Sequence, residues 1–158
     1  MQLSYAKSWF RAKLRLTDPL SVSEALEIHK TKGAYVVASE KNEKLEWYAE
    51  FGNNYVGVGF YNSLLQEYLS YSFQEVDAGK LFLTMSTYRV FDKVTGQVTQ
   101  GTTFFFNKMG RIAIEREDLT IGTKTASDSI GDVSLNWEPF PTFGEYESLT
   151  RIERVKLK

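Results

Sequence analysis

The sequence has no cysteine, a single histidine and a net charge of only -1 over 158 residues. Without cysteine, the chain has no disulfide, thiol nucleophile or cysteine metal site, so its fold must rest on packing. Any Ser–His–Asp triad would have to use His29. The small net charge excludes a strong global field that would steer the chain to nucleic acid or an anionic membrane, although local patches remain open.

Long apolar runs are also missing. Lys7, Arg11, Lys13 and Arg15 interrupt the first sixteen residues, which leaves no apolar core of the kind that a signal peptide needs. No other segment is long and apolar enough to span a bilayer. We therefore expect a cytoplasmic protein. Because no catalytic, metal or phosphate motif stands out, we also expect no enzymatic activity, no metal and no cofactor.

Apolar and aromatic residues are plentiful by contrast, at 42% and 15% of the chain. This content is too high for a disordered segment and is enough to build a large core. A chain of this length is most simply one domain, here residues 1–158.

Residues 67–119 are the most patterned part of the chain. Three compact turns, at 76–80, 92–97 and 107–111, each contain an Asp or Asn that can bond its own backbone and a late Gly suited to positive φ. Such turns join the strands of hairpins. The pattern predicts a β-meander in which Ile112 and Ile114 face a dry side of the sheet and Glu115 and Glu117 face a wet side.

The flanking segments add one helix and more strands. Asp18 is a suitable helix cap and Pro19 fits a first helical turn, so we expect a helix from here to Gly33. Strands are predicted at residues 10–16, 34–39, 45–51, 55–61, 132–137 and from 148 onwards, although a final helix also fits that end, and a mobile loop at 120–131. The expected fold is α+β and sheet-dominated, a large curved antiparallel meander (open or half-barrel) with one N-terminal helix packed on it.

Two glycines in the strand at 55–61, Gly57 and Gly59, alternate with apolar residues. A dinucleotide-binding fingerprint would need a third glycine and a following helix, and both are missing. Close approach of another backbone, or a bend in the strand, explains these glycines better.

Two candidate sites carry carboxylates. Glu115 and Glu117 lie two residues apart on a strand, about 6.6 Å along one face. The carboxyl groups of retaining glycosidases are about 5–5.5 Å apart, but surface pairs of this kind more often provide solubility. The second candidate runs from Trp137 to Glu147 and combines acids, aromatics and fixed turns, a composition suited to protein binding or simply to plugging the open end of the sheet.

Several segments together resemble the immunity proteins of bacterial polymorphic and contact-dependent toxin systems. The segments that carry the resemblance are Leu16-Thr17-Asp18-Pro19, Gly52-Asn53-Asn54-Tyr55-Val56, Phe91-Asp92, Phe106-Asn107, Arg116-Glu117-Asp118 and Asn136-Trp137-Glu138-Pro139. The resemblance implies a small protein that binds the C-terminal domain of a cognate toxin, often a nuclease, and blocks it without chemistry. It does not transfer individual binding residues. From local charge, the candidate toxin-binding residues are Glu115, Glu117, Asp118, Glu138, Glu145, Tyr146 and Glu147.

Two other functions stay open. One is a small-ligand carrier, an incomplete barrel whose apolar cavity is lined by Phe82, Tyr88, Phe104 and Phe106. The other is an enzyme that uses His29 or Glu115. The expected partner is the toxin domain, not nucleic acid or a membrane, and an exposed edge strand leaves a homodimer open.

Overall fold

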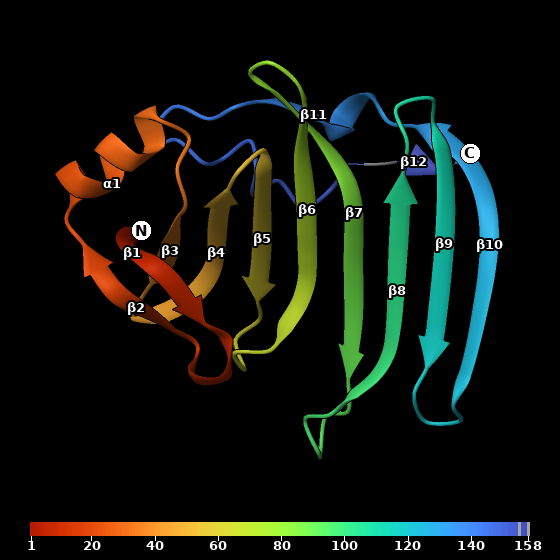
Figure 1. The fold of residues 1–158 in the computed structure, drawn as a ribbon. Coiled ribbons are helices and arrows are strands. Elements are labelled where there is room, and N and C mark those ends of the chain that lie inside the picture. The colour runs from red at the N-terminus through yellow and green to blue at the C-terminus, as the bar shows by residue number, and fades with distance from the viewer. Residues whose placement is uncertain (155, 158) are drawn as a thin grey trace.

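The computed structural model describes residues 1–154 and 156–157, with side chains described through residue 154. Its main feature is an open antiparallel sheet with the strand order β12-β10-β9-β8-β7-β6-β5-β4-β3-β1-β2 (Figure 1). The strands are β1 (Gln2–Phe10), β2 (Arg15–Leu20), β3 (Tyr35–Lys41), β4 (Lys44–Gly52), β5 (Tyr55–Tyr61), β6 (Glu67–Asp77), β7 (Lys80–Phe91), β8 (Val98–Phe106), β9 (Arg111–Asp118), β10 (Thr123–Asp132), β11 (Trp137–Pro139) and β12 (Lys156–Leu157). From β3 to β10 each strand pairs with the next, which confirms the sheet-dominated meander.

The sheet is curved, and its two faces differ. One face, here called the inner face, is covered at one end by helix α1 (Val22–Lys30) and further along by residues 133–154, here called the strap. In Figure 1 the strap runs behind the sheet from β10 toward α1 and then returns toward β12. It contains a short 3-10 helix, η2 (Ser134–Asn136), and β11, which pairs with the first residues of β7.

The main core lies between the inner face and these covering elements. Alternate residues of the central strands point into it, for example Leu69, Tyr71 and Phe73 of β6, each at most 2% exposed. The rings of Tyr35 and Phe51 stack there with centroids 4.7 Å apart. A smaller cluster of Val36, Ala38, Tyr48 and Tyr61 lies on the outer face, where the tip of the β1–β2 hairpin packs against it.

The three meander turns form at the predicted positions. Gly79, Gly96 and Gly110 all have positive φ, between 72° and 89°. The side chains of Asp92 and Asn107 accept hydrogen bonds from backbone N–H groups of their own turns, as expected. In the first turn the acceptor is the Glu75 carboxylate, which bonds the N–H of Gly79, rather than the predicted Asp77.

The predicted start of the helix was wrong. Asp18 and Pro19 belong to β2, and Asp18 adopts a left-handed conformation with φ 57°. The helix begins three residues later, where the Ser21 hydroxyl accepts from the N–H of Glu24 and the Glu24 carboxylate accepts from the N–H of Ser21. This capping box satisfies two free backbone donors at once, which a single Asp cap does not.

The segment predicted as a mobile loop, 120–131, is also different. Most of it forms β10, which pairs with β9 from Thr123 to Ile130 without a shift in register. The strand predicted at 132–137 is instead the end of β10, the 3-10 helix η2 and the first residue of β11. A polar strand exposed on both faces at the sheet edge has no apolar alternation, which is why its pattern resembled a loop.

Two smaller strand predictions fail. Residues 10–16 contain the connection between β1 and β2, with a 3-10 turn at Arg11–Lys13, rather than one strand. Among the described residues, no strand starts near Ser148, because the strap continues as turns through residue 150; the described strand of this end is β12 (Lys156–Leu157). Of the predicted final element, residues 155 and 158 lie outside the described residues.

Gly57 and Gly59 face aromatic side chains rather than another backbone. A Cβ on Gly57 would overlap with the hydroxyl end of Tyr55, and one on Gly59 would overlap with the Tyr48 ring and the Glu67 carboxylate. The Tyr48 ring is held by a stack on Trp9, with centroids 4.8 Å apart. The two glycines therefore leave room for tyrosines on the outer face.

Candidate functional site

A cavity of about 590 Å³ opens on the inner face, between the sheet and the end of the strap. It lies over the part of β7, β8 and β9 that the strap leaves uncovered. Its lining residues are Tyr71, Leu83, Ser86, Tyr88, Thr102, Phe104, Phe106, Arg116, Leu135, Glu153 and Arg154. Three of the four aromatic residues predicted for such a cavity are among them. The fourth, Phe82, packs against Trp137 instead.

The register of the sheet builds the cavity floor. Tyr88, Thr102 and Arg116 are direct cross-strand partners on β7, β8 and β9, and they form one row across the floor. Phe104 and Phe106 follow at every second residue of β8, with parallel rings 6.1 Å apart. Phe105 points to the outer face and is 40% exposed. The period of two in the Phe-rich strand thus provides the apolar floor.

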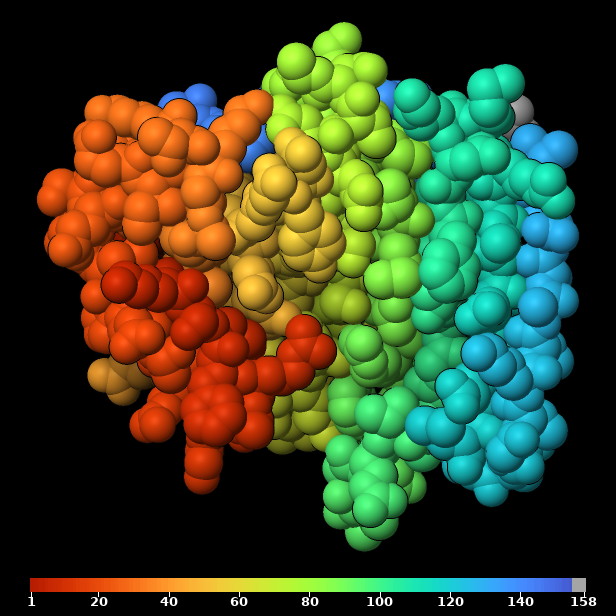
Figure 2. Space-filling view, in the orientation of Figure 1, coloured from red at the N-terminus to blue at the C-terminus, as the bar shows by residue number. Residues whose placement is uncertain are grey.

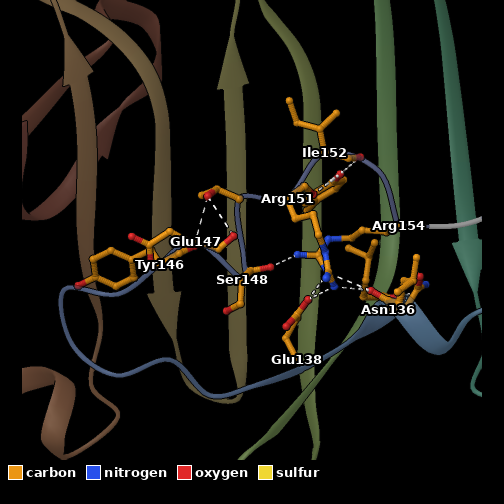
Figure 3. Close-up of polar contacts among 12 residues, drawn as sticks. Asn136, Glu138, Tyr146, Glu147, Ser148, Arg151, Ile152 and Arg154 are labelled. Carbon is orange, nitrogen blue, oxygen red and sulfur yellow. Dashed lines mark hydrogen bonds and ion pairs between the residues drawn. The ribbon is translucent and has the colours of Figure 1, made fainter. Parts of the chain in front are cut away.

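The strap closes one side of the cavity through a buried ion pair. Arg154 is 4% exposed, and its Nη1 atom lies 2.8 Å from Oε1 of Glu138 (Figure 3). The same carboxylate accepts from Arg151, and the Leu135 carbonyl accepts from Arg154 at 3.0 Å. Burial lowers the pKa of Arg154, and the Glu138 carboxylate opposes that shift. The guanidinium also lies over the ring of Phe73, 4.9 Å from its centroid.

Tyr71 fixes the end of the strap to the sheet. Its hydroxyl lies within hydrogen-bond distance of the backbone carbonyls of Arg151 and Ile152, and burial raises the pKa of this phenol. The neutral O–H is therefore the form that donates to the strap. The wall that carries Glu153 and Arg154 is thereby held beside the cavity.

Arg116 stands at the mouth of the cavity. It is exposed and forms no ion pair with a described residue. Its neighbours in the chain, Glu115 and Glu117, point to the outer face, as predicted from the strand period. The Glu115 carboxylate lies 3.6 Å from Nζ of Lys124 on β10.

Asp118 ends β9 on the same side as Arg116. Its carboxylate accepts from the backbone N–H of Thr120 at 2.9 Å and from the Thr120 hydroxyl. The hydroxyl bond and the backbone bond lower the pKa of Asp118, so this carboxylate stays charged at the end of the strand.

The candidate residues of the second cluster, Glu138, Glu145, Tyr146 and Glu147, differ in exposure. Glu145 and Glu147 are exposed on the strap, whereas Tyr146 between them is 2% exposed and its hydroxyl lies 3.1 Å from that of Tyr35. Glu138 is buried in the ion pair described above. Of this cluster, only Glu145 and Glu147 present carboxylates to solvent.

The structure does not bring the two acidic clusters together. Tyr146 packs against Trp47 and Phe51 of β4, and four strands separate β4 from β9 in the sheet. Five strand spacings correspond to about 24 Å along the sheet. Of the two clusters, the β9 cluster is nearer to the cavity: Asp118 lies on the cavity side of β9, whereas Glu115 and Glu117 lie on the opposite face.

His29 has a structural place in the fold. It is 8% exposed, its Nδ1 atom lies 2.8 Å from the Tyr35 hydroxyl, and its Nε2 atom lies 2.9 Å from the Pro141 carbonyl. It thus joins α1 to both the sheet and the strap. Over the described residues, no group of His, Asp and Glu side chains gathers in a way that would hold a metal ion.

Sequence reasoning missed the strap side of the cavity. Sequence reasoning named Tyr88, Phe104 and Phe106 as cavity residues, together with Phe82, which packs against Trp137 instead. Leu135, Glu153 and Arg154 come from an irregular segment, in which no periodic spacing of apolar residues predicts the side that each residue faces. The pattern of Arg151 and Arg154, three residues apart, carried no sign that both would meet Glu138.

Comparison of this chain with known protein-family models, with curated proteins and with solved structures found no match. Within the described part of the chain, no helix is long and apolar enough to cross a membrane.

Proposed function

We propose that this protein binds a bacterial toxin domain and neutralises it by occluding its active site or substrate cleft, without catalysis of its own. One observation carries the proposal: the aromatic cavity opens on the inner face at the end of β9, where Arg116 lines it, and Glu115 and Glu117 present carboxylates on the outer face of the same strand end. The resemblance of several segments to immunity proteins supports the same class of partner.

This arrangement has the anatomy of a protein interface. Interface hot spots are aromatic or arginine side chains that fill a pocket, surrounded by polar residues that exclude water. Tyr88, Phe104 and Phe106 offer such a pocket. The carboxylates of Glu115 and Glu117 would face basic groups of the kind that line the substrate cleft of a nuclease, and would add attraction that falls as salt concentration rises.

The test uses the C-terminal domain of the protein encoded immediately upstream, which the proposal expects to be the toxin, and measures binding by titration calorimetry. The Glu115→Lys/Glu117→Lys double variant should bind at least about tenfold more weakly, with the larger loss at low salt. The Glu145→Lys/Glu147→Lys variant makes the same charge change on the strap and should bind nearly as the wild type does. Unchanged binding in both variants would show that the acidic clusters are not part of the interface. No binding by the wild-type chain would refute the proposal.

A second candidate is a carrier of a small apolar ligand, and the open cavity favours it. Its volume of about 590 Å³ falls within the roughly 300–1,000 Å³ of small-molecule sites. Phenylnaphthylamine, a neutral dye that fluoresces in apolar surroundings, is a direct probe. Saturable binding that is lost in Thr102→Trp, which fills the cavity floor, and kept in Thr103→Trp, on the opposite face of β8, would support the carrier. Absence of saturable binding to the wild type would count against it.

A further inference from the structure

Strand β10 leaves one edge of the sheet open. It pairs with β9 along Thr123–Ile130, and β12 pairs with its other side only at Gly131 and Asp132. No described strand pairs with the outer edge of residues 123–129. This edge forms one rim of the molecule, at the right in Figure 2. Its free N–H and C=O groups are a template for another strand.

The two edges of the sheet are protected differently. β2, at the opposite edge, contains Pro19 and the left-handed Asp18, both of which interrupt strand pairing. β10 has no proline, its register with β9 shows no bulge, and residues 123–128 are all exposed. Proteins usually blunt such an edge unless it is used.

The charges on β10 are arranged symmetrically. Lys124 and Asp128 lie two residues on either side of Ala126, and both point to the outer face. Their present partners are Glu115, at 3.6 Å, and Arg111, at 4.0 Å. The Lys124 and Asp128 side chains are 61% and 66% exposed, so these surface pairs are weak and leave both side chains accessible to a further partner.

We propose that two copies of the chain pair through β10, antiparallel, about a two-fold axis at Ala126. In this register Lys124 lies opposite Asp128 of the partner subunit, and the symmetry repeats the pair. On the inner face, Thr125 lies opposite Ser127 of the partner subunit. Opposite charges and Thr–Ser pairs are favourable cross-strand neighbours. The contact is isologous and closed, so it gives a dimer rather than a fibre.

Neighbouring registers lose these pairs. An axis at Ser127 places Lys124 opposite Ile130 of the partner subunit, and an axis at Thr125 places Asp128 opposite Gly122 of the partner subunit. In the register at Ala126, Ile130 lies opposite Gly122 of the partner subunit and adds no cross-strand pair of its own. The charge pattern therefore selects the register at Ala126.

Light scattering coupled to size exclusion tests the dimer. The wild-type chain should show twice the 18.1 kDa of one chain, with a dimer fraction that rises with concentration. Lys124→Asp and Asp128→Lys each place like charges opposite one another and should weaken self-association more than about tenfold. Lys108→Asp, in the β8–β9 turn, makes the same charge change away from the edge and should stay dimeric.

Mixing the two single variants gives the decisive result. In a heterodimer, the two acids of the Lys124→Asp chain face the two lysines of the Asp128→Lys chain, so a one-to-one mixture should associate while each variant alone stays monomeric. Recovered association also shows that the variants are folded. A monomeric wild type at every concentration, or a mixture that does not associate, would overturn the proposal. The outcome does not depend on toxin binding.

Discussion

The guanidinium of Arg154 and the carboxylate of Glu138 form an ion pair, 2.8 Å between Nη1 and Oε1, in which the side chains are only 2% and 7% exposed. The pair connects the end of the strap to β11, and β11 is paired with β7. The end of the strap is thus attached to the sheet through β11. The position of the cavity wall depends on this contact.

Glu138→Ala should therefore destabilise the fold strongly. Removing one partner of a buried ion pair leaves the other charge buried and unpaired, at a cost of about 3–5 kcal/mol. Urea denaturation gives the free energy of unfolding. Glu147→Ala, an exposed acid on the same strap, is the matched control and should change it by less than about 0.5 kcal/mol. Equal effects of the two substitutions would mean that Arg154 finds water or another partner.

Gly59→Ala should also destabilise. The added methyl would overlap with the Tyr48 ring, which is held between the stack on Trp9 and a hydrogen bond from Arg11 at 3.0 Å. Overpacking of this kind costs about 1–3 kcal/mol. Gly101→Ala, in β8, is the control, because nothing lies within 4 Å of its added Cβ. If thermal unfolding shows the same small change for both variants, Tyr48 is free to move and the close contact does not constrain the fold.

The sequence predicts the central fold well, for a physical reason. Strands buried on one face alternate, as β9 does, and turn positions with positive φ favour Gly, so β9 and the turns at Gly79, Gly96 and Gly110 could be located from residue types alone. β10 could not, because an edge strand that is wet on both faces has no alternation to detect.

The candidate site was only half predictable. Tyr88, Phe104 and Phe106 were predicted as cavity residues and do line the cavity, but the covering strap lacks any period, so its packing follows from tertiary contacts. Glu138 and Tyr146 show the consequence: both looked like surface binding residues in a polar, aromatic segment, and both are buried. Local composition does not reveal that a carboxylate will meet two arginines from thirteen or more residues further along the chain.

Ser21→Ala tests where α1 begins. The hydroxyl of Ser21 accepts from the N–H of Glu24, 3.2 Å away, and loss of such a cap costs about 1 kcal/mol. Asp18→Gly should not destabilise, because Asp18 has φ 57° in β2, a conformation that glycine adopts without strain. Free energies of unfolding of the two variants distinguish the positions. If Asp18→Gly destabilised the fold and Ser21→Ala had no effect, Asp18 rather than Ser21 would be the residue that caps α1.

His29 should make stability depend on pH. Burial lowers the pKa of its imidazole below the usual 6.5, while the bond to the Pro141 carbonyl opposes the shift. The folded state therefore binds this proton less readily than the unfolded state. The neutral ring contributes its full stability above pH 6.5, and that contribution falls as pH decreases from there toward the folded-state pKa.

The measurement compares wild type and His29→Gln by urea denaturation at about pH 7.5 and about pH 5.5. The wild type should lose more stability than the variant over this interval. Since His29 is the single histidine, the difference between the two slopes belongs to this side chain. The variant should also be less stable than the wild type at the higher pH, because it loses ring contacts with Phe51 and Phe140. Parallel slopes would mean that His29 binds its proton equally well in both states, and that the Tyr35–His29–Pro141 connection tolerates a charged ring.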